Sequence, residues 1–251
     1  MSAVNDGLIE TSPCDRVQLP RVPRKKKQKY TVAEYERLVE RVDRWWRPMI
    51  VVMAETGIRL GEAQGLEARD FAGRSLHVER TIVELSKRLS AKLDQGNQTQ
   101  WILKPFPKDG EPRDVLLTEE TAQMVKDLIR TRELFPGDRL FPMHDGQGKP
   151  LRTPEWPNGR PVTRTVLQGV WRRAHGDDIP VRRLHDLRGS MISWMIMGGA
   201  DFGAVMNRAG HSRLSTTQGY FDQFADAQER ALRGLEIARR MGREATEQQG
   251  E

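Results

Sequence analysis

The chain has 251 residues, which is long enough for one large domain or two small ones with a hydrophobic core. Apolar residues make up 37% of the sequence and charged residues 30%, a composition that indicates a packed globular fold and excludes a disordered or fibrous protein. Lys and Arg outnumber Asp and Glu by 41 to 35, and the net charge of +6 agrees with a polyanionic partner without requiring one.

Residues 1–29 show no periodic pattern of apolar residues and are predicted to form a flexible arm or linker. Three prolines interrupt this segment, and a run of basic residues ends it. Such a run is either a solvated tail or a linker that follows the phosphates of a DNA strand. In the second interpretation, the residues that contact DNA are Arg24, Lys25, Lys26, Lys27 and Lys29.

The folded part begins at Tyr30 and is predicted to start with two helices. Thr31 and Glu34 form the pair of a capping box, and apolar residues then recur at helical spacing. Pro48 can begin a second helix, whose apolar run is ended by Gly57 in a left-handed conformation.

A change in the apolar period predicts strands, which are expected to form a small antiparallel sheet, over residues 76–82, 101–103 and 115–117. Asp109 and Gly110 lie between the last two strands and can supply the positive φ angles that a tight turn needs. These two strands are therefore predicted to form a hairpin with Lys108 near its tip.

Helical spacing returns in the rest of the chain. Thr118 and Thr163 are predicted to cap the starts of two helices, which are separated by a loop-rich stretch. Further helices are predicted over residues 184–197, 201–208 and 226–243. The predicted fold is a mainly helical α+β domain over residues 30–251, with a small antiparallel sheet on one side.

The sequence shows no sign of export or membrane insertion. The single cysteine, Cys14, has no partner for an internal disulfide, and no Cys or His lies at the spacing of a zinc site. The longest apolar stretch is too short to span a bilayer, and the N-terminus lacks the apolar core of a signal peptide. We therefore expect a cytoplasmic protein without a membrane partner.

Four side chains near the end of the chain are candidates for chemistry, although each alone has an ordinary explanation. His185 and Arg188 lie one helical turn apart and can form a solvated or hydrogen-bonded pair. His211 follows Gly210, a predicted helix cap, and can bond nearby carbonyls. Tyr220 can be a half-buried aromatic residue whose hydroxyl bonds the backbone. The functional hypothesis rests on their combination.

Three segments together resemble the tyrosine recombinases of the phage integrase family. The first arginine box of that family is similar to ETGIRLGEAQGLEARDF, its His-x-x-Arg motif to LHDLRGS, and its Gly-His-Ser and tyrosine segment to AGHSRLSTTQGYFD. The order of the segments and the intervals between them match as well. The residues in the matching positions are Arg59, Glu62, His185, Arg188, His211 and Tyr220.

The chemistry of phosphodiester cleavage explains why these residue types are needed. Attack gathers negative charge on the non-bridging oxygens, and two guanidinium groups, those of Arg59 and Arg188, can hold these oxygens without a metal or another cofactor. A phenol is a better leaving group than an alkyl hydroxyl, so Tyr220 suits reversible cleavage.

The resemblance implies a role for each remaining residue. Tyr220 forms a 3′-phosphotyrosyl intermediate, His185 accepts or positions the tyrosine proton, and His211 donates a hydrogen bond to the phosphate. Glu62 and Asp186 orient the helices that carry the arginine and the histidine.

A lysine is expected to protonate the departing 5′ oxygen. The segment PKDGEPRDVLL resembles the hairpin that delivers the family's catalytic lysine, which points to Lys108, although Lys104 lies close enough to compete. Two features depart from the family. Gly189 stands where a histidine is usual, and the interval from Arg59 to the lysine is lengthened by polar residues 86–100.

The resemblance further implies double-stranded DNA as the partner, a homotetramer on DNA and a monomer in free solution. A helical core-binding domain normally precedes the catalytic domain in that family, so the chain is expected to be a fragment of a longer integrase rather than a natural short form with weak DNA binding. Two other functions stay open. One is a DNA-binding regulator of the same fold that no longer catalyses, and the other is a nicking and closing enzyme similar to type IB topoisomerases.

Overall fold

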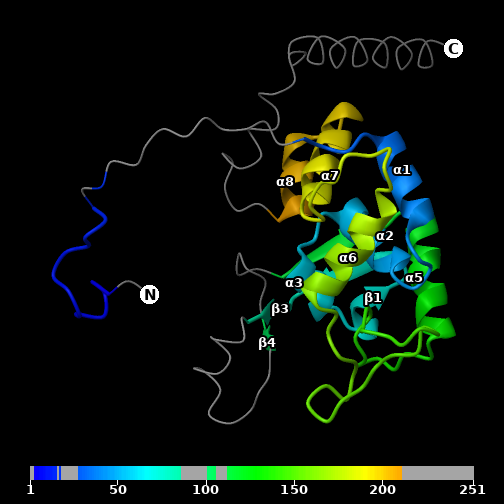
Figure 1. The fold of residues 1–251 in the computed structure, drawn as a ribbon, viewed down its shortest axis with the longest axis horizontal. Coiled ribbons are helices and arrows are strands. Elements are labelled where there is room, and N and C mark those ends of the chain that lie inside the picture. The colour runs from blue at the N-terminus through cyan, green and yellow to red at the C-terminus, as the bar shows by residue number, and fades with distance from the viewer. Residues whose placement is uncertain (1–2, 16, 18–27, 86–100, 106–111, 211–251) are drawn as a thin grey trace, which may run out of the picture.

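The structure is a computed structural model that describes residues 3–15, 17, 28–85, 101–105 and 112–210 (Figure 1). Its helices are α1 (Val32–Arg41), α2 (Arg47–Thr56), α3 (Leu60–Gly65), the 3-10 helix η1 (Ala68–Asp70), α5 (Glu119–Thr131), α6 (Arg164–Ala174), α7 (Asp186–Met197) and α8 (Phe202–Ala209). Its strands are β1 (Phe71–Ala72), β2 (Ser75–Val78), β3 (Thr81–Glu84), β4 (Trp101–Lys104) and β5 (Arg113–Leu116). The predicted mainly helical α+β fold is confirmed, whereas the helix predicted over residues 226–243 lies outside the described residues.

The ends of the helices follow from local sequence signals. At the start of α1, Thr31 Oγ1 accepts a hydrogen bond from Glu34 N at 3.1 Å, and the Glu34 carboxylate accepts one from Thr31 N at 2.8 Å. Gly57 ends α2 with a φ of 68°, a left-handed conformation that glycine adopts without steric cost. The predicted caps Thr118 and Thr163 are confirmed, since each side chain accepts a hydrogen bond from a backbone N–H of its helix, and the side chain of Asp201 caps α8 in the same way.

The strands form two small antiparallel sheets, with the orders β1-β2-β5 and β3-β4. Val78 of β2 pairs in register with Arg113 of β5, and Thr81 of β3 pairs with Lys104 of β4. Strand β4 thus pairs with β3, and β5 pairs with β2. In the described part of the chain, β4 and β5 do not pair with each other. The predicted hairpin between them is wrong, because the apolar period and the turn residues predict strands without fixing which strands pair.

Helix α2 lies at the centre of the helical part and packs against α1, α3, α5 and α7 (Figure 1). All of its side chains from Pro48 to Ala54 are buried, so this helix contributes to the hydrophobic core along its whole length. Helices α7 and α8 form a second, smaller apolar cluster. Among the described helices, none is long and apolar enough to cross a membrane.

Tyr30 is the first buried residue of the folded part, with 2% of its surface exposed. Its N–H donates to Ser190 Oγ at 2.9 Å, and its carbonyl accepts from Trp194 Nε1 at 2.9 Å. Its hydroxyl shares a hydrogen bond with His175 Nε2 at 2.9 Å. These contacts join the beginning of the domain to α7, the helix that carries Arg188.

Helix α3 lies directly on strand β3 and on Arg80, the residue before the strand, and two glycines of the helix make close contacts there. A Cβ atom on Gly61 would lie 2.5 Å from the carbonyl oxygen of Ile82, and one on Gly65 would lie 2.8 Å from that of Arg80. Because any other residue would push the helix away, glycine sets the position of α3. It thereby sets the position of Arg59, the residue before the helix.

Candidate active site

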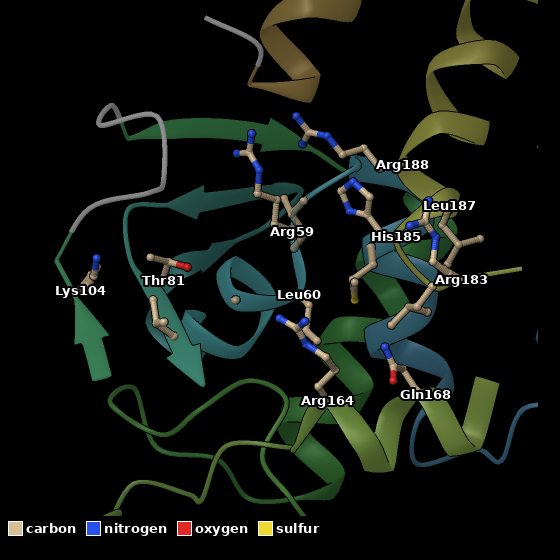
Figure 2. Close-up of a pocket in the computed structure, with 15 residues that line it drawn as sticks. Arg59, Leu60, Thr81, Lys104, Arg164, Gln168, Arg183, His185, Leu187 and Arg188 are labelled. Atoms are coloured by element: carbon tan, nitrogen blue, oxygen red, sulfur yellow. The ribbon is translucent and has the colours of Figure 1, made fainter. Parts of the chain in front are cut away.

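A cleft of about 560 Å³ lies between the start of α3, strands β3 and β4, and the starts of α6 and α7 (Figure 2). Arg59, His185 and Arg188 line this cleft, and Figure 2 shows them together at one end of it. Lys104 lines the cleft from β4, and Arg59 lies between it and His185 (Figure 2). Residues that are far apart in the sequence therefore meet at one site.

Arg59 is held in place by the capping interaction that starts α3. Its backbone N–H donates to Glu62 Oε2 at 2.9 Å, and its guanidinium Nη1 donates to Glu62 Oε1 at 2.9 Å. The side chain of Glu62 is fully buried, while that of Arg59 is 23% exposed. The buried carboxylate thus fixes the guanidinium and leaves part of it open to the cleft.

Arg113 is a second partner of Glu62, and it was not predicted from the sequence. Its Nη2 lies 2.7 Å from Glu62 Oε2. Burial acts to raise the pKa of Glu62, but the charge and hydrogen bond of Arg113, together with Arg59, hold that pKa below its usual range. One sequence signal could have indicated Arg113: it lies two residues before the buried Val115, so both are on the same face of β5.

Arg188 lies in the first turn of α7 and is 6% exposed. Its Nη1 donates to the carbonyl oxygen of Gly57 at 2.6 Å. Gly57 is the cap of α2 and lies two residues before Arg59. Arg59 and Arg188 are therefore anchored to the same turn of the chain.

His185 is the residue before α7, is exposed and lines the cleft. Asp186, which was predicted to orient this region, accepts hydrogen bonds from Arg183 N at 3.0 Å and from Arg183 Nη2 at 3.1 Å. The carboxylate of Asp186 therefore closes the turn that leads into His185.

Further polar side chains of the cleft were not predicted from the sequence. Arg164 and Gln168 lie on α6, are exposed, and line the cleft opposite the end where Arg188 lies (Figure 2). The backbone N–H of Arg164 donates to Glu84 Oε2 at 2.9 Å, which ties α6 to β3. Arg164 follows the predicted cap Thr163, so its place at a helix start was readable, but its place in the cleft depends on tertiary packing.

Some predicted site residues lie outside the described residues, namely Lys108, His211, Tyr220, Arg24, Lys25, Lys26 and Lys27. Their placement stays a prediction. Lys29 is described, and burial lowers the pKa of its ammonium group. Gly210, the residue before His211, ends α8 with a φ of 62°. Within the described ranges, no three His, Cys, Asp or Glu side chains are grouped so that they could hold a metal ion.

Comparison with known sequences finds related proteins over most of the chain. The family model for the phage integrase family matches residues 28–226. The ICEBs1 integrase of Bacillus subtilis is 20% identical over 220 residues, which are 86% of this chain and 56% of that protein. The tyrosine recombinase XerD of Pseudomonas aeruginosa is 28% identical over 236 residues, which are 86% of this chain and 64% of that protein. The chain thus spans less than two thirds of these relatives.

Solved structures share the fold at low sequence identity. The Tn1549 transposon integrase in complex with transposon right end DNA has a TM-score of 0.65 and 21% identity, covering 93% of this chain and 74% of that one. The catalytic domain of bacteriophage HP1 integrase has a TM-score of 0.51 and 16% identity, covering 83% of this chain and 95% of that one. The fold described above is therefore shared with these two integrases.

Proposed function

Because the chain belongs to the phage integrase family, we propose that it is a site-specific recombinase that cuts and rejoins double-stranded DNA through a covalent link to Tyr220. The observation that carries this proposal is the meeting of Arg59, Arg188 and His185 in one cleft. The guanidinium groups of Arg59 and Arg188 are held by the same turn of the chain, which suits the binding of one tetrahedral phosphate. The negative charge of this phosphate increases in the transition state.

In the proposed reaction, the phenol oxygen of Tyr220 attacks the phosphorus atom, and the bond from phosphorus to the 5′ oxygen breaks. His185 accepts or positions the phenol proton, and the 5′ oxygen takes a proton from a lysine. His211 donates a hydrogen bond to the phosphate. The 3′-phosphotyrosyl ester keeps the energy of the broken bond, so the reverse attack by a 5′ hydroxyl rejoins the strand without an external energy source.

The general acid is proposed to be Lys108, with Lys104 as the competing residue. The position of Lys104 on the wall of the cleft supports its candidacy, since an ammonium group there is on the same side of the molecule as the two arginines. The resemblance of the PKDGEPRDVLL segment to the family's lysine hairpin supports Lys108.

The basic run that ends at Lys29 is proposed to follow DNA phosphates and to lead into the folded part at Tyr30. The net charge of +6 supports binding to a polyanion. On DNA we expect a homotetramer, and in free solution a monomer, as implied by the family. A DNA substrate also fits the expectation that the protein acts in the cytoplasm.

The proposal is tested by covalent capture, which works even when the target sequence is unidentified. The chain is incubated with a pool of nicked duplexes of randomised sequence, in which cleavage near the nick releases a short fragment and traps the enzyme. We expect protein–DNA adducts that survive denaturation and whose DNA shares a common sequence.

The chain has three tyrosines, so the assignment of the nucleophile can be checked with a matched control. Tyr220→Phe should abolish the adduct, while Tyr35→Phe, on helix α1, should retain it. An adduct that persists in Tyr220→Phe would refute the assigned nucleophile. Complete absence of adducts with the unchanged chain, at DNA concentrations where binding is detected, would refute the recombinase function.

A further inference from the structure

Arg113 lies where three elements of the site meet. It is the first residue of β5 and pairs in register with Val78 of β2, and its side chain is 11% exposed. Burial of a guanidinium group costs free energy unless partners compensate for it. The contacts of Arg113 therefore indicate its role in the structure.

The first contact is with Glu62 of α3. Glu62 Oε2 accepts from Arg113 Nη2 at 2.7 Å and from Arg59 N at 2.9 Å, while Glu62 Oε1 accepts from Arg59 Nη1 at 2.9 Å. One buried carboxylate is thus shared by a residue of the cleft and a residue of the sheet. The position of the Arg59 guanidinium therefore depends on Glu62 and, through Glu62, on Arg113.

The second contact is with Gly210, the left-handed cap of α8. A Cβ atom on Gly210 would lie 2.8 Å from Arg113 Cζ and 3.0 Å from Arg113 Nε, so the guanidinium packs on the backbone of this residue. The same helix end is tied to α2 by Arg208 Nε, which donates to the carbonyl oxygen of Glu55 at 3.2 Å. Gly210 is the residue from which the chain continues to His211 and Tyr220.

We propose that Arg113 is a positioning residue that fixes Glu62 against Arg59 and, at the same time, fixes the end of α8 from which the histidine and tyrosine segment departs. This inference rests on the proposed function, because it assigns Arg113 to the assembly of that active site. Arg113 acts through Glu62 and Gly210, whereas Arg59 contacts the phosphate.

The charges around Glu62 explain how the effect can be measured. Arg59 at the start of α3 and Arg113 on β5 face its carboxylate, while Glu55 of α2 and Arg208 of α8 pair with each other. Burial favours the protonated form of Glu62, and the charge of Arg113 opposes burial. Loss of Arg113 should therefore raise the pKa of Glu62. The hold on Arg59, which needs the ionised carboxylate, should then fail at a higher pH than in the unchanged protein.

The variants are Arg113→Gln, which removes the charge, and Arg113→Lys, which keeps the charge without the planar fork. The matched control is Arg132→Gln. Arg132 is also buried, at 8% exposure, but its Nη2 donates to the carbonyl oxygen of Trp45, away from the cleft. Any general effect of removing a buried arginine should appear in this control.

The first measurement is the pKa of Glu62 by carbon-13 NMR of labelled glutamate, with the signal identified by its loss in Glu62→Gln. We expect this pKa to rise in Arg113→Gln, to rise less in Arg113→Lys and to stay unchanged in Arg132→Gln. This measurement uses no DNA and therefore does not depend on the proposed function. An unchanged pKa in Arg113→Gln would overturn the inference.

The second measurement is the pH profile of adduct formation and of inorganic sulfate binding, since the charge of this tetrahedral dianion is constant over the pH range used. Near neutral pH and above, Arg113→Gln should differ little from the unchanged protein in sulfate binding. At acidic pH, binding and the adduct rate should fall by about tenfold, the effect of one charge-assisted hydrogen bond. Arg113→Lys should recover part of this loss, and in a Glu62→Gln background Arg113→Gln should cause no further loss of sulfate binding, because the effect on Arg59 passes through Glu62.

The outcomes separate the two proposals. Adducts that form equally well in Arg113→Gln and the unchanged protein at every pH would overturn the role of Arg113 and leave the recombinase function intact. A raised Glu62 pKa in Arg113→Gln, in a protein that forms no adduct with any duplex, would overturn the recombinase function and leave the contact between Arg113 and Glu62 established.

Discussion

Arg188 and Gly57 are joined by a hydrogen bond of 2.6 Å from the guanidinium Nη1 to the carbonyl oxygen. Gly57 ends α2 in a left-handed conformation, and Arg59 follows two residues later. The backbone of one short turn therefore carries one arginine and orients the other. A change at Gly57 should affect both arginines at once.

Replacement of Gly57 by alanine is expected to reduce both stability and adduct formation. The φ of 68° is unfavourable for alanine, and the added Cβ would collide with Met191 Cε and meet Arg188 Cγ at 3.6 Å. Gly73→Ala is the control, because Gly73 has a φ of 64° but no atom within 4 Å of an added Cβ. In urea unfolding, Gly73→Ala should lose about 1 kcal/mol and Gly57→Ala clearly more. Equal losses would show that the Met191 side chain moves away from the added Cβ at no cost.

Replacement of Arg59 or Arg188 by lysine should slow adduct formation by at least about 100-fold while the fold is kept. Lysine retains the charge but lacks the planar fork that holds two oxygens at once. Rates on the captured duplex, together with thermal unfolding, are the measurements for Arg59→Lys and Arg188→Lys. Arg152→Lys serves as the control, since Arg152 binds Asp138 outside the cleft. Near-normal rates in the cleft variants would exclude the proposed phosphate clamp.

The general acid can be identified with a substrate whose bridging 5′ oxygen is replaced by sulfur. A thiolate leaves without protonation, since a thiol has a pKa of about 8.5, so loss of the acid should matter only for the oxygen substrate. We expect Lys108→Ala to react slowly with the oxygen duplex and at a normal rate with the sulfur duplex. Lys104→Ala should react normally with both. The reverse pattern would assign the role to Lys104.

Two glycine variants should have opposite effects on stability. A Cβ on Gly61 would lie 2.5 Å from the carbonyl oxygen of Ile82, so Gly61→Ala should displace α3, destabilise the protein and slow adduct formation. Gly169 lies within α6, and the nearest atom to an added Cβ is Arg173 Nη1 at 3.5 Å. Gly169→Ala should therefore stabilise by about 0.5–1 kcal/mol through helix propensity, with no change in rate. Thermal unfolding measures the changes in stability, and the capture assay measures the rates. A Gly61→Ala variant as stable and active as the unchanged protein would contradict the close contact between α3 and Ile82.

The parts of the fold that depend on local sequence could be predicted, whereas the parts that depend on distant contacts could not. Thr31, Thr118 and Thr163 cap helices through residues within one turn, so the sequence reveals them. The pairing of β4 with β3 and of β5 with β2 joins distant segments, and no local signal selects it.

The same distinction applies to the site. Arg59, His185 and Arg188 were predicted because their motifs resemble a known family, and the structure brings them to one cleft. Arg113 was missed because its partners, Glu62 and Gly210, lie far from it in the sequence. A charged residue on the inward face of a strand was the only available sign.

The contact of α3 with β3 has a mechanical consequence. At Gly61 and Gly65 the helix backbone lies close to the carbonyl groups of Ile82 and Arg80, and among the described atoms nearest to an added Cβ there, only the Thr81 hydroxyl belongs to a side chain. Helix and strand should consequently shift as one stiff unit. In the proposed complex with DNA, any shift of the strands would therefore carry the Arg59 guanidinium with it and change its position relative to the phosphate.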